Sequence, residues 1–211
     1  MLYILKKATG YIFNDEDLSR FLTLLNEESN LVFKYTICYN YQNLKYIAGE
    51  KSKIIFDKIF TTKPFDMISL AFCILNTNYV FQEISDLVTS EYLINQQGFP
   101  NECKDRVMLD RFYDYVIAAC YYNQITLENA QKAFFDYNFI EYLLHHIKLW
   151  SEKENFNVES WLVPCWTYIK NSCPPDKKAS FSADILHAID CIGEATETLL
   201  DTFYEAANCI P

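Results

Sequence analysis

The sequence predicts a mostly α-helical, bundle-like globular protein, and three observations support this fold class. Hydrophobic residues make up 51% of the 211 residues and aromatic residues 17%, a composition that excludes a disordered chain. Only four glycines occur, whereas folds with many β-strands use glycine at their tight turns. From Thr61 onward, apolar residues recur every three to four positions, as they do along the buried face of a helix.

The first 60 residues give a mixed signal. Asn14 is a suitable N-cap, and the acidic residues that follow it suit the first turn of a helix that ends before Asn30. Residues 31–42 then alternate in a period of two and are rich in aromatic and β-branched types, which predicts a strand. With residues 44–48 and 53–59, this segment predicts a small β-hairpin or sheet. Because helices rich in aromatic residues can imitate a short alternation, helices are the alternative.

Further along the chain, the periodicity predicts helices separated by short breaks. We expect them at about residues 64–76, 78–94, 103–122, 127–135, 139–150 and 161–170, with a final helix over 181–211. The short connection after residue 135 predicts that the two helices beside it form an αα-hairpin. The strongest break is Gln96–Asn101. We therefore expect a single globular unit over residues 1–211, with possible lobes at 1–98 and 99–211.

The charge of the chain is strongly negative and unevenly distributed. The net charge is −10, and residues 112–211 hold six basic against fourteen acidic side chains. Such a field opposes binding to nucleic acid or to an anionic membrane, and it favours encounter with a basic protein. We therefore expect no nucleic-acid partner and no membrane partner. The alternative is that the acidity only maintains solubility.

The last thirty residues contain the most informative pattern. Residues 181–211 hold six acidic side chains and no lysine or arginine. Five of these acids are spaced by four, three, four and four residues, which places them along one side of a continuous helix. These five are the predicted partner-binding residues: Asp190, Glu194, Glu197, Asp201 and Glu205. A merely solvated acidic face is the alternative.

The eight cysteines are scattered, with no C-x-x-C pair of the kind that zinc and redox sites use. The apolar stretch that follows Met1 is much shorter than the core of a signal peptide, and no apolar run reaches the length of a membrane span. We therefore expect reduced, mostly buried thiols in a cytoplasmic protein.

Few residues suggest chemistry. His145 and His146 are adjacent, with Glu141 one helical turn before them, but a metal site needs at least three converging ligands. The third histidine, His187, precedes Cys191 by four residues and suggests a cysteine nucleophile, for which burial as a structural thiol is the alternative. Glycine-rich phosphate loops and hydrolase motifs are absent from the sequence. We predict no catalytic residues, no metal and no cofactor.

These observations favour binding over catalysis. We expect a non-enzymatic acidic protein that neutralises a basic protein partner, such as a bacterial immunity protein or antitoxin that blocks a nuclease toxin. Aromatic residues such as Tyr121, Tyr122, Trp161 and Trp166 would act as anchors, or else pack in the core. The alternatives are a pathogen effector or viral protein that binds a host target, a helical scaffold subunit, and an enzyme that uses the three histidines.

Overall fold

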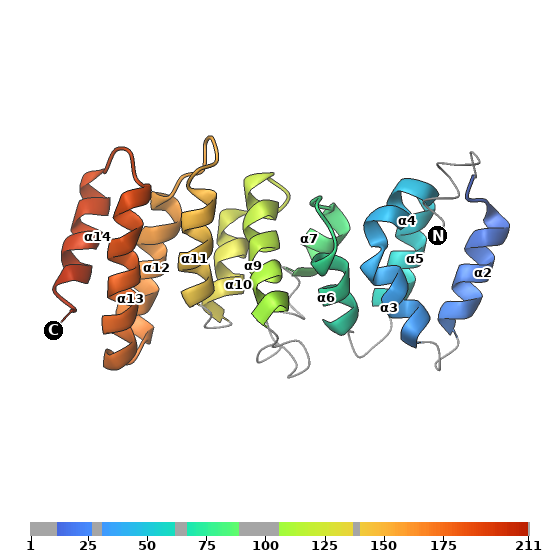
Figure 1. Cartoon of the computed structure of the whole chain (residues 1–211), viewed down its shortest axis with the longest axis horizontal. Coiled ribbons are helices and arrows are strands. Elements are labelled where there is room, and N and C mark those ends of the chain that lie inside the picture. Colours follow the sequence, from blue (N-terminus) through green and yellow to red (C-terminus); the bar gives the residue numbers. More distant parts are fainter. Residues whose placement is uncertain (1–11, 27–30, 62–66, 89–105, 137–139, 211) are drawn as a thin grey trace. The chain divides into compact units, whose positions relative to one another are not determined.

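A computed structural model describes residues 12–26, 31–61, 67–88, 106–136 and 140–210 (Figure 1). These residues form twelve α-helices and a short 3₁₀ helix, η2 (Ala188–Cys191), and none of them forms a strand. The prediction of a mostly helical protein is therefore confirmed. In chain order the α-helices are α2 (Asp15–Asn26), α3 (Leu31–Tyr39), α4 (Tyr41–Ala48), α5 (Lys51–Phe60), α6 (Met67–Leu75), α7 (Gln82–Val88), α9 (Arg106–Tyr121), α10 (Leu127–Asp136), α11 (Ile140–Trp150), α12 (Glu159–Ser172), α13 (Pro175–His187) and α14 (Glu197–Ala207).

The chain folds into two compact units. The N-terminal unit comprises Met1–Val88 and Gly98–Tyr115, and the C-terminal unit comprises Thr89–Gln97 and Val116–Pro211. The division therefore falls within α9. The break that the sequence predicts at Gln96–Asn101 lies outside the described residues.

The predicted β-hairpin or sheet in the first 60 residues is wrong, because the described residues of that region form α2 to α5. In α3, apolar side chains such as Leu31 and Val32 lie on the exposed side, so apolar residues on both sides of the helix produced the apparent alternation. In α4 and α5 the buried residues repeat at helical steps of three and four. They are Tyr41, Leu44, Ile47 and Ala48, then Ser52, Ile55, Phe56 and Ile59. Between these helices Gly49 adopts φ 55° and donates its N–H to the Lys45 carbonyl, which ends α4.

The start of α2 agrees with the sequence prediction. The Asn14 side chain accepts a hydrogen bond from the Asp17 N–H at 3.0 Å, and the Asp17 carboxylate accepts one from the Asn14 N–H at 2.9 Å. This reciprocal pair satisfies two backbone donors that a helix start would otherwise leave without partners.

The core of the N-terminal unit is built by short helices that pack in pairs. Helix α2 packs on α5, α3 on α6, α4 on α5 and α6 on α7. Ile55, Leu70 and Ile84 are fully buried, and the rings of Tyr41 and Phe56 lie 5.0 Å apart. Burying side chains of this size contributes about 1.5–3 kcal/mol each, which is what stabilises such short helices.

The helices of the C-terminal unit follow one packing rule. From α10 to α14, each helix contacts the next helix and the one after it, and Figure 1 shows them side by side in chain order. The predicted αα-hairpin of α10 and α11 is therefore confirmed. Side chains from these helices meet in the core, including Phe134, Leu143, Leu162 and Ile185.

Helix ends in this unit are set by local side chains. Asn123 adopts φ 58° after α9, and its N–H donates to the Cys120 carbonyl while the next N–H reaches Ala119. This is the pattern of a Schellman C-cap, in which asparagine replaces the usual glycine. Thr126 then caps α10 by accepting the Asn129 N–H at 3.2 Å.

Pro164 lies inside α12 and removes one hydrogen bond of the helix. Proline has no N–H, so the carbonyl four residues earlier, that of Ser160, receives no donor from the helix. The side chain of Gln131, on α10, fills this role by donating its Nε2–H to the Ser160 carbonyl at 2.7 Å. The Gln131 side chain thus replaces the hydrogen bond that α12 lacks at Pro164, and the same contact joins α10 to α12.

The predicted final helix over 181–211 is wrong as a single element. Helix α13 ends at His187, η2 follows, and α14 begins only at Glu197. The interruption contains Gly193, and Thr196 caps the new helix by accepting the Leu199 N–H at 3.2 Å. Glycine disfavours a continuous helix, and a threonine N-cap favours the start of a new one. These two residues therefore interrupt the helix despite the regular spacing of the acids.

We predict that Gln131→Ala lowers the free energy of unfolding of the C-terminal unit by about 1 kcal/mol, because it leaves the Ser160 carbonyl without its donor. The loss should be smaller in a Pro164→Ala background, since an alanine at that position restores the N–H that the helix lacks. Urea unfolding followed by tryptophan fluorescence measures this unit selectively, because all three tryptophans lie within it.

The control is Lys132→Ala, the neighbouring residue on α10, whose exposed ion pair with Glu128 at 3.6 Å contributes less than about 1 kcal/mol. An equal loss from Gln131→Ala in both backgrounds would contradict the repair role of that side chain.

Candidate functional site

The break between α13 and α14 separates the five predicted acids. Asp190 lies in η2 and Glu194 in the connecting segment, while Glu197, Asp201 and Glu205 lie on α14 at steps of four. All five are exposed. The structure therefore places three of them on one helix and not five.

Glu205 is engaged by the protein itself. Its Oε2 accepts a hydrogen bond from the Trp166 indole at 2.8 Å and forms an ion pair with Lys170 at 2.7 Å. These two contacts, that of Lys170 foremost, hold the pKa of Glu205 below its usual value. The Glu205 carboxylate thus links α14 to α12. The sequence pattern did not predict this structural role.

The remaining acids of α14 share their side of the helix with apolar residues. Leu200 is 57% exposed and Tyr204 72% exposed, and both lie one to three positions from Glu197 or Asp201. The opposite side, with Leu199, Thr202, Phe203 and Ala206, is buried against α12 and α13. Four exposed residues share one side of the helix, and we call them the outer face of α14: Glu197, Leu200, Asp201 and Tyr204.

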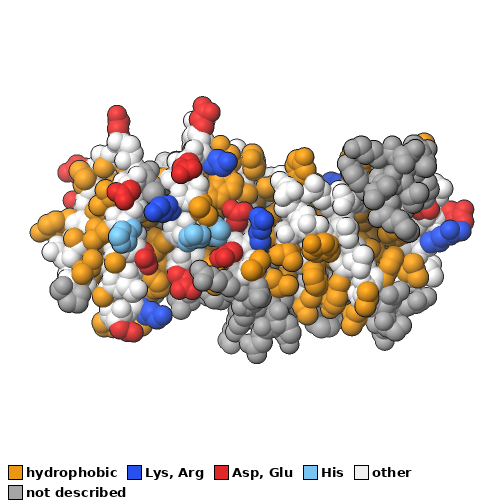
Figure 2. Space-filling view, in the orientation of Figure 1, with side chains coloured by type: hydrophobic (Ala, Val, Ile, Leu, Met, Phe, Trp, Pro, Cys, Tyr) orange, Lys and Arg blue, Asp and Glu red, His pale blue; other side chains and the backbone are white. Residues whose placement is uncertain are grey.

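The surface around this helix is acidic but mixed. The C-terminal unit contains six basic and fourteen acidic residues, a net charge of −8, and the N-terminal unit contains twelve and fourteen, a net charge of −2. Figure 2 shows acidic side chains over α11 to α14 interspersed with hydrophobic side chains and a few basic ones. Most of the net negative charge therefore belongs to the C-terminal unit, and apolar contacts are available within it.

The histidines do not form a metal site in the part of the chain that the structure describes. His146 is buried, whereas His145 and His187 are exposed, and no three potential ligands converge among the described residues. Asp184 lies one helical turn before His187. Burial raises the pKa of this carboxyl, although the imidazole opposes the shift.

Most of the described thiols have the environment of structural cysteines, whereas Cys209 is exposed. Cys38, Cys73 and Cys165 are buried, and burial raises the pKa of Cys165 and of the half-buried Cys120. A raised pKa keeps a thiol protonated and weakly nucleophilic. Cys191 lies in η2 and not on α13, the helix that ends at His187.

The suggested aromatic anchors divide between core and surface. Trp161 and Trp166 are buried, so these two residues belong to the core, which is the alternative given for them. Tyr122 is exposed at the end of α9, and Tyr121 donates its hydroxyl to the Glu154 carbonyl at 2.8 Å. Tyr204, which the sequence did not single out, is the more exposed aromatic residue and lies beside the acids.

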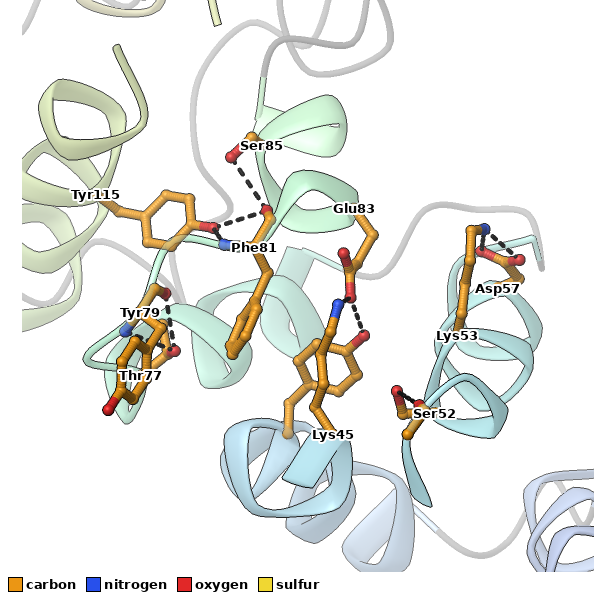
Figure 3. A network of polar contacts seen from close by, with 12 residues as sticks. Lys45, Ser52, Lys53, Asp57, Thr77, Tyr79, Phe81, Glu83, Ser85 and Tyr115 are labelled. Atoms are coloured by element: carbon orange, nitrogen blue, oxygen red, sulfur yellow. Dashed lines mark hydrogen bonds and ion pairs between the residues drawn. The ribbon is translucent and has the colours of Figure 1, made fainter. Parts of the chain in front are cut away.

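A polar cluster in the N-terminal unit was also not predicted. Glu83 on α7 accepts hydrogen bonds from the Tyr41 hydroxyl and the Lys45 ammonium, both on α4, and its side chain is only 11% exposed (Figure 3). Burial opposes ionisation of Glu83, but the bonds from Lys45 and Tyr41 outweigh it and lower its pKa. Burial, together with the hydrogen bond to Glu83, raises the pKa of Tyr41. The cluster ties α4 to α7.

Comparison with known protein families, with characterised proteins and with solved structures gives no match. Within the described residues, no helix has both the length and the apolar character that crossing a membrane requires.

We predict that Glu83→Gln lowers the free energy of unfolding of the N-terminal unit by about 1–3 kcal/mol at pH 7, because Lys45 loses its charged partner. The pKa of Glu83 is lowered in the folded state, so its stabilising effect is present above the usual value of 4.5 and is lost as the pH falls through the folded-state pKa. The difference between variant and wild type should therefore shrink below pH 4.5. Hydrogen exchange in α4 and α7 measures it.

Glu16→Gln is the matched control, because it removes an ion pair with Arg20 in which both side chains are 71% exposed. Exposed pairs of this kind contribute less than about 1 kcal/mol. A loss in Glu83→Gln that is no larger than this, or that does not depend on pH, would show that the cluster adds little to stability.

Proposed function

We propose that this chain is a non-enzymatic binding protein that recognises and neutralises a basic protein partner through the outer face of α14. The observation that carries the proposal is the composition of that face, where two carboxylates lie beside an exposed leucine and an exposed tyrosine. Charged residues guide encounter and exclude wrong partners, whereas aromatic and aliphatic anchors supply most of the binding energy at protein interfaces.

The electrostatic field of the C-terminal unit supports the binding of a basic partner. Its net charge of −8 attracts a cationic surface over roughly a Debye length, which is about 8 Å at physiological ionic strength. Glu194 and Asp190 lie on the segment that leads into α14 and extend the acidic surface beyond the helix. Glu205 contributes less to this field, because Lys170 pairs with it.

A nuclease toxin is the kind of basic partner that best suits such a surface. A protein that holds the phosphate backbone of a nucleic acid needs lysine and arginine at its binding surface. A rigid acidic protein that covers this surface competes directly with the substrate. We therefore propose an immunity protein or antitoxin as the specific form of this function.

We expect the reversal of three acids, Glu194→Lys, Glu197→Lys and Asp201→Lys, to weaken partner binding by at least about tenfold without unfolding the protein. All three side chains are exposed, and α14 is fastened to α12 through Glu205 and capped through Thr196, which this variant leaves intact. The partner is first isolated by quantitative affinity capture with the wild-type chain from cells that make the protein, and its affinity for the variant is then measured. Its association rate with the wild type should then fall steeply as salt rises.

The control distinguishes the effect of where the acids lie from the effect of the net charge of the unit. Glu141→Lys, Glu152→Lys and Glu154→Lys change the charge of the same unit equally, at exposed sites away from α14. This variant should retain most of the affinity, while Tyr204→Ala should lose about ten- to hundredfold, as expected of an aromatic anchor. An equal loss in both triple variants, or a partner with an acidic surface, would overturn the proposal.

A further inference from the structure

A groove of about 480 Å³ opens in the N-terminal unit beside the Lys45–Glu83 pair. It is lined by Gln42, Asn43, Lys45, Tyr46, Tyr79 and Phe81. Two of its aromatic side chains are strongly exposed, Tyr46 at 61% and Tyr79 at 63%. Aromatic rings presented in this way at a groove offer a large binding area at a small cost in side-chain entropy.

The segment that carries Tyr79 and Phe81 is held in place. The Tyr115 hydroxyl accepts the Phe81 N–H at 2.8 Å and donates to the Phe81 carbonyl at 3.0 Å, and the Thr77 hydroxyl donates to the Tyr79 carbonyl at 3.0 Å. Figure 3 shows the rings of Tyr79 and Phe81 projecting to the same side of this segment. Burial raises the pKa of Tyr115 to about 12, so its hydroxyl stays protonated and able to donate. The groove is therefore preorganised, which favours binding.

Two polar groups of the groove, those of Gln42 and Lys45, offer donors to a ligand. The Gln42 Oε1 accepts the Asn78 N–H at 2.9 Å, so the NH₂ end of this amide is the end available for a ligand. The Lys45 ammonium can only donate, and it lies 4.8 Å from the centre of the Phe81 ring. A ligand that offers carbonyl acceptors complements these two donors.

The charge of the groove favours a neutral ligand. Of the lining residues, Lys45 alone is charged, and Glu83 compensates its charge. Because this pair is neutral overall, neither a phosphate group nor a cationic ligand would gain much electrostatic attraction from it. These considerations disfavour nucleic acid and methylated lysine, which are two common ligands of aromatic surfaces.

We propose that this groove binds a proline-rich segment of a partner protein in the polyproline II conformation. Proline has no N–H, and a polyproline II helix has no internal hydrogen bonds, so its carbonyls are available to the Gln42 and Lys45 donors. Aromatic-lined grooves accept its rings, and the ligand loses little conformational entropy because it is already extended. This site lies in the N-terminal unit and is independent of the function proposed for α14.

The test uses a fluorescein-labelled peptide of eight prolines and measures its fluorescence anisotropy with the full chain. We expect saturable binding that Tyr79→Ala weakens at least about tenfold and Tyr79→Phe changes by less than about threefold, because phenylalanine keeps the ring that stacks on proline. Tyr204→Ala, which removes an exposed tyrosine from α14, should leave peptide binding unchanged.

Two further probes decide between ligand classes. An eight-residue Gly-Ser peptide should not bind, and an eight-nucleotide oligothymidylate should bind more weakly than the proline peptide. Binding of the proline peptide no tighter than that of either probe, or equal losses in Tyr79→Ala and Tyr204→Ala, would overturn the proposal. The triple reversal on α14 should bind the proline peptide as the wild type does, so failure of one proposal is distinguishable from failure of the other.

Discussion

The shortness of its helices is the constraint on which this structure depends. The described helices run from 7 to 16 residues, and isolated helices below about 12–15 residues are marginal in water. Each helix is therefore stable only when its apolar face is covered by a neighbour. The many aromatic residues serve this need, since a ring such as that of Tyr41 or Phe134 buries a large area from a single position. Polar side chains then tie together elements that are distant in sequence, as Glu83 does for α4 and α7, Gln131 for α10 and α12, and Glu205 for α12 and α14.

The sequence predicts this fold where the signal is local. The Asn14 and Thr126 caps and the helical periodicity of α9 to α12 each depend on residues within a few positions of one another. The prediction failed at residues 31–60, where apolar residues on both sides of the helices imitate a strand. The prediction is also wrong after His187, because the regular spacing of the acids continues across Gly193 and Thr196, where the helix is interrupted.

The candidate site could be predicted only in part, because some of its contacts join residues that are distant in the sequence. The exposure of Glu197 and Asp201 can be predicted, because charged side chains are usually exposed. The ion pair of Glu205 cannot be predicted in this way, because its partner, Lys170, is 35 residues away in the sequence. The contacts of Glu83 with Tyr41 and Lys45 span 42 and 38 residues. No periodicity within one helix contains such information, because it arises when two helices pack. An acid that the sequence pattern assigns to an exposed surface can thus link two helices in the fold, as Glu205 does for α12 and α14.

The two proposed surfaces use different physical interactions, and this difference has a consequence for their behaviour. The outer face of α14 would act through carboxylates in a unit of net charge −8, so its association would depend on long-range attraction that salt screens. The groove beside Lys45 is compensated in charge by Glu83, and it would act through ring contacts and hydrogen bonds that form only when the ligand has arrived. Raising the ionic strength should therefore slow binding at α14 while leaving the groove almost unaffected. A partner that uses both surfaces would keep a salt-resistant part of its affinity, and that part would be lost when Tyr79 is replaced by alanine.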